Sequence, residues 1–161
     1  MLPPLTGDGL SSSCRLLDTR LLDEERSPVG ALQLTSPGYL DCLVRILRPD
    51  VVATVEIDLW RERRRVFTAT SRPLTSHQPA TFAAGVQIPA DFLNEQAYRA
   101  RFRLNVRPIA DAEATPLTVA DESLEFSAMN PHPARSVWND WPWNRNGVVS
   151  PRLVWNVSYE Q

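Results

Sequence analysis

The sequence contains no lysine, so arginine supplies every basic side chain apart from two histidines. Without lysine there is no phosphate-binding loop of the form G-x-x-x-x-G-K-[ST], which excludes a P-loop nucleotide hydrolase within these 161 residues. Arginine suits bidentate recognition of carboxylates and phosphates, but a GC-rich coding sequence produces the same bias. A net charge of -2 gives no basic field, which argues against nucleic acid as the main partner.

Cysteine is scarce, and long apolar runs are missing. Cys14 and Cys42 offer no metal-ligand spacing, and we expect no disulfide framework. No stretch is apolar for long enough to cross a bilayer, and the first residues lack the basic and apolar regions of a signal peptide. The sequence therefore predicts a protein of the reducing cytoplasm, and no motif calls for a cofactor.

Helix signals are weak as well, because 14 prolines are spread through the chain. Residues 1–13 are rich in Pro, Gly and Ser and predict a flexible N-terminal linker. We expect a single helical turn within residues 89–97. Between residues 14 and 161, short apolar runs alternate with Pro, Asp, Ser and Asn at a spacing typical of an all-β antiparallel sandwich.

Residues 98–107 alternate with a period of two, as a half-buried strand does. The apolar residues are predicted to face the core, whereas Arg99, Arg101 and Arg103 fall on the outward parity. One interpretation is a solvated face that keeps the sheet soluble. The other is a row of guanidinium groups that binds a polysaccharide carrying carboxylate or phosphate groups.

Tryptophan is the most informative residue for a glycan, because an indole stacks on the apolar face of a sugar ring. Trp60 follows Glu56 and Asp58 on the polar parity of a strand, where a ligand explains it better than core packing does. These three residues are therefore candidate glycan contacts.

A second group of tryptophans lies in the segment SVWNDWPWNRNG, where Trp138, Trp141 and Trp143 are either a hydrophobic plug at one end of the sandwich or further glycan contacts. Trp155 instead shares an apolar parity with its neighbours in the last strand. That pattern favours the core or a dimer interface.

Candidates for catalysis are few. His77 and His132 both lie in loop-like, proline-flanked segments, which are typical of exposed histidines. Glu56 and Asp58 share a strand face, and two neighbouring carboxylates could serve a glycosidase. Outward acids, however, are usually only solvated. We therefore predict a protein that is not an enzyme, with a glycan-acting enzyme and a purely structural dimerisation module as the alternatives.

Four segments resemble one family in their order and spacing: LLDEERSPV, RRRVFTATS, IPADFLNEQAYRARFRL and NGVVSPRLVW. The last two are similar to its "IP, two or three residues, LLN-E-G-x-Y" and "G-V-V-R-P-x-L-x-W" patterns. The family is the C-terminal polysaccharide-binding domain of O-antigen and related ABC-transporter ATPases, the Wzt type. The resemblance spans residues 16–157, and Glu25-Arg26 stand where an Asp-Gly turn is common.

The resemblance implies an immunoglobulin-like or jelly-roll β-sandwich that forms a homodimer through its last strand. It also implies that the domain holds a bacterial polysaccharide, at its finished end, for export. The partners would be the ATPase and permease subunits of an ABC transporter, at the inner face of the cytoplasmic membrane. The chain is then either a binding domain separated from its ATPase or a stand-alone relative.

Overall fold

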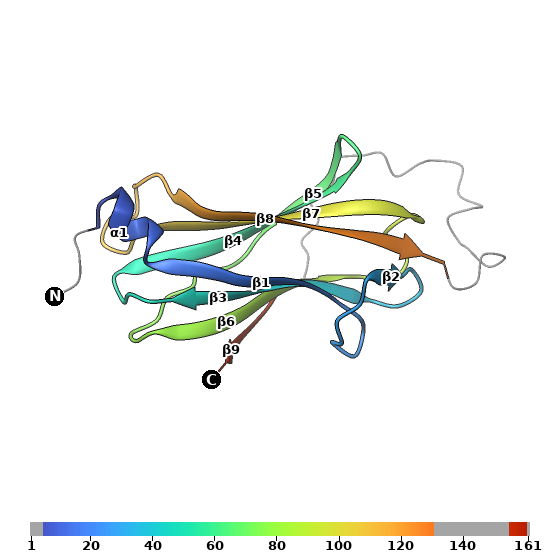
Figure 1. Ribbon diagram of the computed structural model, residues 1–161, viewed down its shortest axis with the longest axis horizontal. Helices are drawn as coiled ribbons and strands as arrows, with labels where there is room; N and C mark the ends of the chain where they lie inside the picture. Colours follow the sequence, from blue (N-terminus) through green and yellow to red (C-terminus); the bar gives the residue numbers. More distant parts are fainter. Residues whose placement is uncertain (1–4, 131–154, 161) are drawn as a thin grey trace.

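The computed structural model describes residues 5–130 and 155–160, which fold into two β-sheets packed face to face (Figure 1). One sheet has four strands in the order β1-β3-β6-β9, and the other has five in the order β2-β8-β7-β4-β5. The strands are β1 (Cys14–Leu22), β2 (Ala31–Gln33), β3 (Gly38–Ile46), β4 (Val51–Arg61), β5 (Arg64–Thr70), β6 (Ala80–Ile88), β7 (Gln96–Pro108), β8 (Leu117–Met129) and β9 (Trp155–Glu160).

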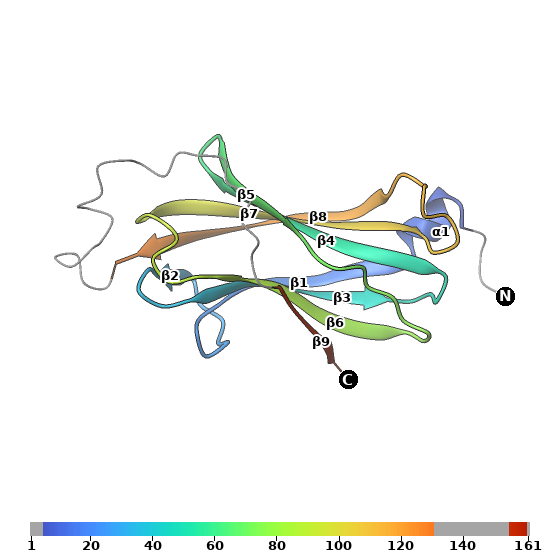
Figure 2. The ribbon, with the colours of Figure 1, turned by 180° about the vertical axis from the view of Figure 1, so that it is seen from behind.

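The all-β sandwich predicted from the sequence is confirmed, and its strand order is that of the immunoglobulin type. β8-β7-β4-β5 correspond to strands G, F, C and C′ of such a domain, and β1, β3 and β6 to strands A, B and E. β9 occupies the place beside β6 that strand D usually takes (Figure 2). The sheet pairing is antiparallel except between β2 and β8, which pair in parallel from Ala31 to Gln33.

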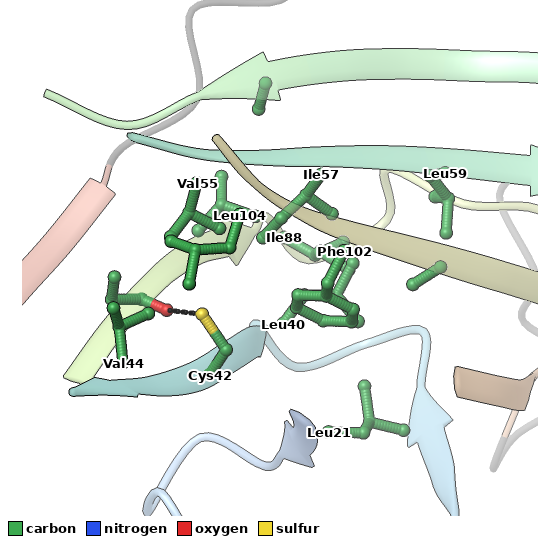
Figure 3. Packing of buried hydrophobic residues seen from close by; sticks show 14 of the residues in the cluster. Leu21, Leu40, Cys42, Val44, Val55, Ile57, Leu59, Ile88, Phe102 and Leu104 are labelled. Atoms are coloured by element: carbon green, nitrogen blue, oxygen red, sulfur yellow. Dashed lines mark hydrogen bonds between the residues drawn. The ribbon is translucent and has the colours of Figure 1, made fainter. Parts of the chain in front are cut away.

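The apolar parities predicted from the sequence form the core between the sheets (Figure 3). Leu40, Cys42 and Val44 project from β3 and are fully buried, and the alternate residues of β4 and β7 meet them from the other sheet. The Cys42 thiol donates a hydrogen bond to the Ala84 carbonyl oxygen at 3.4 Å. Both cysteines are free and buried, and burial raises the pKa of the Cys14 thiol to about 11, so this thiol stays protonated at neutral pH.

One local prediction is wrong. Residues 89–97 contain no helical turn. Asp91 has a positive φ of 59°, and its amide donates to the Leu34 carbonyl, so the chain turns and enters β7 directly. The short helix α1 (Gly7–Ser11) lies instead in the N-terminal segment, where Leu5 and Leu10 pack against the core. The prediction that residues 1–13 act as a flexible linker stays a prediction.

The turn after β1 forms without the Asp-Gly pair that is common in the resembled family. Arg26 adopts the left-handed conformation, with φ of 64°, that glycine usually provides. The Asp23 carboxylate accepts hydrogen bonds from the amides of Glu25 and Ser27, both at 2.9 Å. The Arg26 guanidinium lies 4.2 Å from the centre of the Tyr39 ring. Side-chain contacts thus support a turn that sequence preference disfavours.

Gly85 of β6 marks a close approach between strands of the four-stranded sheet. A Cβ atom at this position would lie 2.7 Å from the Asp41 Oδ1 atom and 2.9 Å from the Leu40 carbonyl oxygen. We expect Gly85→Ala to destabilise the protein by about 1–3 kcal/mol, the usual cost of overpacking. Chemical denaturation checks this against Gly30→Ala, where a Cβ atom meets nothing within 4 Å. Equal stability of the two variants would contradict the prediction.

Candidate functional site

The strand register brings the predicted site residues of β4 and β7 onto one surface, the outer face of the five-stranded sheet. Trp60 lies opposite Arg99, Asp58 opposite Arg101, and Glu56 opposite Arg103. β5 and β8 extend this surface on either side. We call it the polar face, and its members are Glu56, Asp58, Trp60, Arg65, Thr68, Arg99, Arg101, Arg103, Asp121, Ser123 and Glu125.

The centre of the polar face is an ion-pair cluster. The Arg103 guanidinium donates to the carboxylates of Glu56 and Asp58, at 2.7 Å in the case of Asp58 Oδ2. The Thr68 hydroxyl donates to the other Asp58 oxygen at 2.5 Å. Because Asp58 is only 2% exposed, its charge needs these partners inside the protein. The contacts give Asp58 and Arg103 a structural role, whereas their predicted contact with a glycan stays a prediction.

Arg101 forms a second ion pair at the surface. Its Nε and Nη2 atoms donate to the two carboxylate oxygens of Asp121 at 2.9 and 2.5 Å. This hydrogen bonding lowers the pKa of Asp121 below its ordinary value. Both side chains are about two-fifths exposed, at 42% and 40%, so solvent screens the pair and it adds little stability.

The row of Arg65, Trp60 and Arg99 differs from these ion pairs. Trp60 is half-buried, and the Arg65 guanidinium lies 5.9 Å from the centre of its ring. Arg99 is exposed and forms no ion pair or side-chain hydrogen bond with any residue that the structure describes. Its guanidinium is therefore available to a ligand next to an indole, which is a combination suited to a sugar ring.

A hollow of about 530 Å³ opens beside Arg99. Ala97 of β7 and Ser127 of β8 lie opposite each other there, and their small side chains leave space above the sheet. Three charged residues border this space, namely Arg99, Glu125 and Glu62. The hollow is also lined by Gly30, Tyr98 and Phe126. Its volume lies within the range of small-ligand sites.

Several residues of this surface escaped prediction from the sequence. Arg65, Asp121 and Glu125 lie on β5 and β8, and Glu62 lies in the turn between β4 and β5. The recurrence of polar residues at every second position, Asp121, Ser123 and Glu125, is the sequence pattern that could have placed the β8 residues on an outward face. The predicted contacts Trp138, Trp141 and Trp143 lie outside the described residues, as does His132.

Within residues 5–130 and 155–160, no three His, Cys, Asp or Glu side chains are arranged to hold a metal ion. The same part of the chain has no helix with the length and apolar character needed to span a membrane.

These features define an immunoglobulin-like β-sandwich with a polar outer face and an open hollow. No family model and no curated protein matches the sequence. Among solved structures, the C-terminal domain of Wzt matches with a TM-score of 0.57 and 11% identity, covering 73% of this chain and 74% of that one. The resemblance predicted from the sequence is therefore confirmed in the fold, which this chain shares with the Wzt C-terminal domain.

Proposed function

We propose that this protein binds a bacterial polysaccharide without altering it and serves polysaccharide export by an ABC transporter. The observation that carries the proposal is Arg99, which borders an open hollow and lies opposite Trp60 of the neighbouring strand, on a fold shared with the Wzt C-terminal domain. A binding role also agrees with the carboxylates of Glu56 and Asp58, because both hold Arg103 and neither is placed beside the hollow. The ligand would be an O-antigen-like glycan, bound at its terminus.

The transporter itself would supply the partners. In this proposal the domain works at the cytoplasmic side of the membrane with the ATPase and permease subunits of the transporter, as the fold shared with the Wzt C-terminal domain supports. Co-expression with the ATPase and permease encoded nearest to its gene tests this part. Co-purification of the three proteins in detergent is the expected result, and recovery of this chain alone would contradict it.

Trp60→Ala is expected to weaken glycan binding by roughly 1–3 kcal/mol, by analogy with the stacking of aromatic side chains on other ring-shaped ligands. Its melting temperature should change little, because Trp60 is only half-buried on the outer face. Titration calorimetry with a panel of oligosaccharides from bacterial polysaccharides measures the affinity.

Two further variants provide the controls for Trp60. Trp60→Phe keeps an aromatic ring and should retain most of the affinity. Leu117→Ala removes an exposed apolar side chain of β8 elsewhere on the same sheet and should leave binding unchanged. Equal affinity of Trp60→Ala and the unaltered protein would remove this indole from the site.

We also propose that the protein is a homodimer whose interface includes β9. This strand is at the edge of the four-stranded sheet, and its Tyr159 is 55% exposed and meets Phe82 edge-to-face with ring centres 5.5 Å apart. An apolar edge strand is suited to pairing with a second chain. Sedimentation equilibrium at micromolar concentration should show a dimer, and truncation after Ser150 should abolish it. A monomeric full chain, together with undiminished stability of the truncated one, would contradict the proposal.

A further inference from the structure

The charges of the polar face are balanced within the protein. Arg101 is bound by Asp121, and Arg103 by Glu56 and Asp58. Asp58 is 2% exposed and depends on Arg103 as its bound cation, so an acidic ligand that drew Arg103 away would leave a buried charge without that partner. The row of outward arginines is therefore not a row of free guanidinium groups.

The hollow beside this cluster carries more negative than positive charge. Glu62 and Glu125 border it together with Arg99, and Glu125 lies directly opposite Arg99 across the β7–β8 ladder. All three side chains are exposed. A carboxylate or phosphate on a ligand would meet one cation and two anions there, so attraction to Arg99 would be offset by repulsion.

Hydroxyl groups match this arrangement better. An ionised carboxylate only accepts hydrogen bonds and a guanidinium only donates them, whereas a sugar hydroxyl does both. Adjacent hydroxyls of one ring can donate to Glu125 or Glu62 while accepting from Arg99. The small side chains of Ala97 and Ser127 leave room for the ring between them.

We infer that the hollow bordered by Arg99, Glu125 and Glu62 selects a neutral, hydroxyl-rich glycan over an acidic one. This inference rests on the proposed function and names the class of its ligand. It replaces the acidic polysaccharide that the arginine alternation suggested, because the carboxylates that neutralise these arginines come from other strands.

Matched ligands test the selectivity. Hexasaccharides of neutral hexoses are titrated beside the same hexasaccharides oxidised at C6 to uronic acids, at low and at physiological salt. We expect the neutral members to bind at least tenfold more tightly than their acidic counterparts, with less than a twofold change in affinity across the salt series. Tighter binding of the acidic members, weakened by salt, would overturn the inference while leaving glycan binding intact. No binding by any member would overturn the proposed function itself.

Two variants locate the selectivity in the hollow. Glu125→Gln removes one negative charge and is expected to reduce the preference for neutral glycans severalfold, by improving the binding of the acidic members. Arg99→Gln is expected to weaken the binding of the neutral glycans about tenfold. Both side chains are exposed, so the melting temperatures of the variants should match that of the unaltered protein. Unchanged binding in both variants would place the ligand elsewhere and overturn the inference.

Discussion

Arg103→Met is expected to lower the free energy of unfolding by about 3–5 kcal/mol, the usual cost of breaking a buried ion pair on one side. Arg103 is the shared partner of Glu56 and Asp58, and Asp58 is only 2% exposed. Methionine replaces the stem of the arginine but leaves the buried carboxylate without a cation. The hydroxyl of Thr68 remains as one donor and does not neutralise the charge. Urea denaturation measures the loss.

Two comparisons make this result specific to the buried charge. Adding Asp58→Asn to Arg103→Met should recover a large part of the stability, because the charge that lost its partner is then absent. Arg101→Met breaks a pair that is two-fifths exposed and should cost about 1 kcal/mol or less. Similar losses for Arg101→Met and Arg103→Met would show that burial does not distinguish the two pairs.

Arg103 and Arg99 are expected to differ in how their mutation affects glycan binding. Mutation of Arg103 is expected to weaken glycan binding only through the loss of folded protein, whereas mutation of Arg99 is expected to act on binding alone. Arg99 forms no ion pair or side-chain hydrogen bond with the described residues, and it borders the hollow. Binding measured per folded molecule therefore separates the two arginines, although their positions in the alternating strand are equivalent.

Phe102→Ala is expected to cost about 3–5 kcal/mol of stability through the cavity it leaves in the core. Phe102 is fully buried on the inner side of β7, where it lies opposite Ile57 of β4 and among side chains of both sheets (Figure 3). The cavity stays partly open, because hydrogen-bonded ladders hold the strands of each sheet in place and limit their collapse around it. The melting temperature should fall by about 10 °C for a domain of this size.

The matched control for Phe102 is Ile109→Ala. Ile109 follows β7 directly and is 48% exposed, so its truncation should change stability by no more than about 0.5 kcal/mol. A small loss for Phe102→Ala, comparable to that of Ile109→Ala, would mean that the core between β4 and β7 repacks easily.

Prediction from the sequence was accurate where alternation was strict and failed where strands are short or irregular. In β7 every apolar residue from Tyr98 to Val106 is buried, as its parity predicts. β2 escaped prediction because three residues show no periodicity, and its partner in the parallel pairing is distant in the chain. β8 was predicted only near its end, because Glu122 falls on the inward parity and interrupts the pattern. Glu122 is exposed, and it lies in the part of β8 that precedes the pairing with β2 at Ser127–Met129.

The sequence by itself determined the all-β class, the inward faces of β3, β4 and β7, and the candidate residues on the outward faces of β4 and β7. These properties are local, since a period of two specifies which side chains share a face. Only the tertiary structure decided that Glu56 and Asp58 neutralise Arg103, that Asp121 neutralises Arg101, and that Arg99 borders a hollow. Those contacts depend on which strands are neighbours and in what register. Both are set by the packing of the two sheets over the whole chain, and no single segment contains that information.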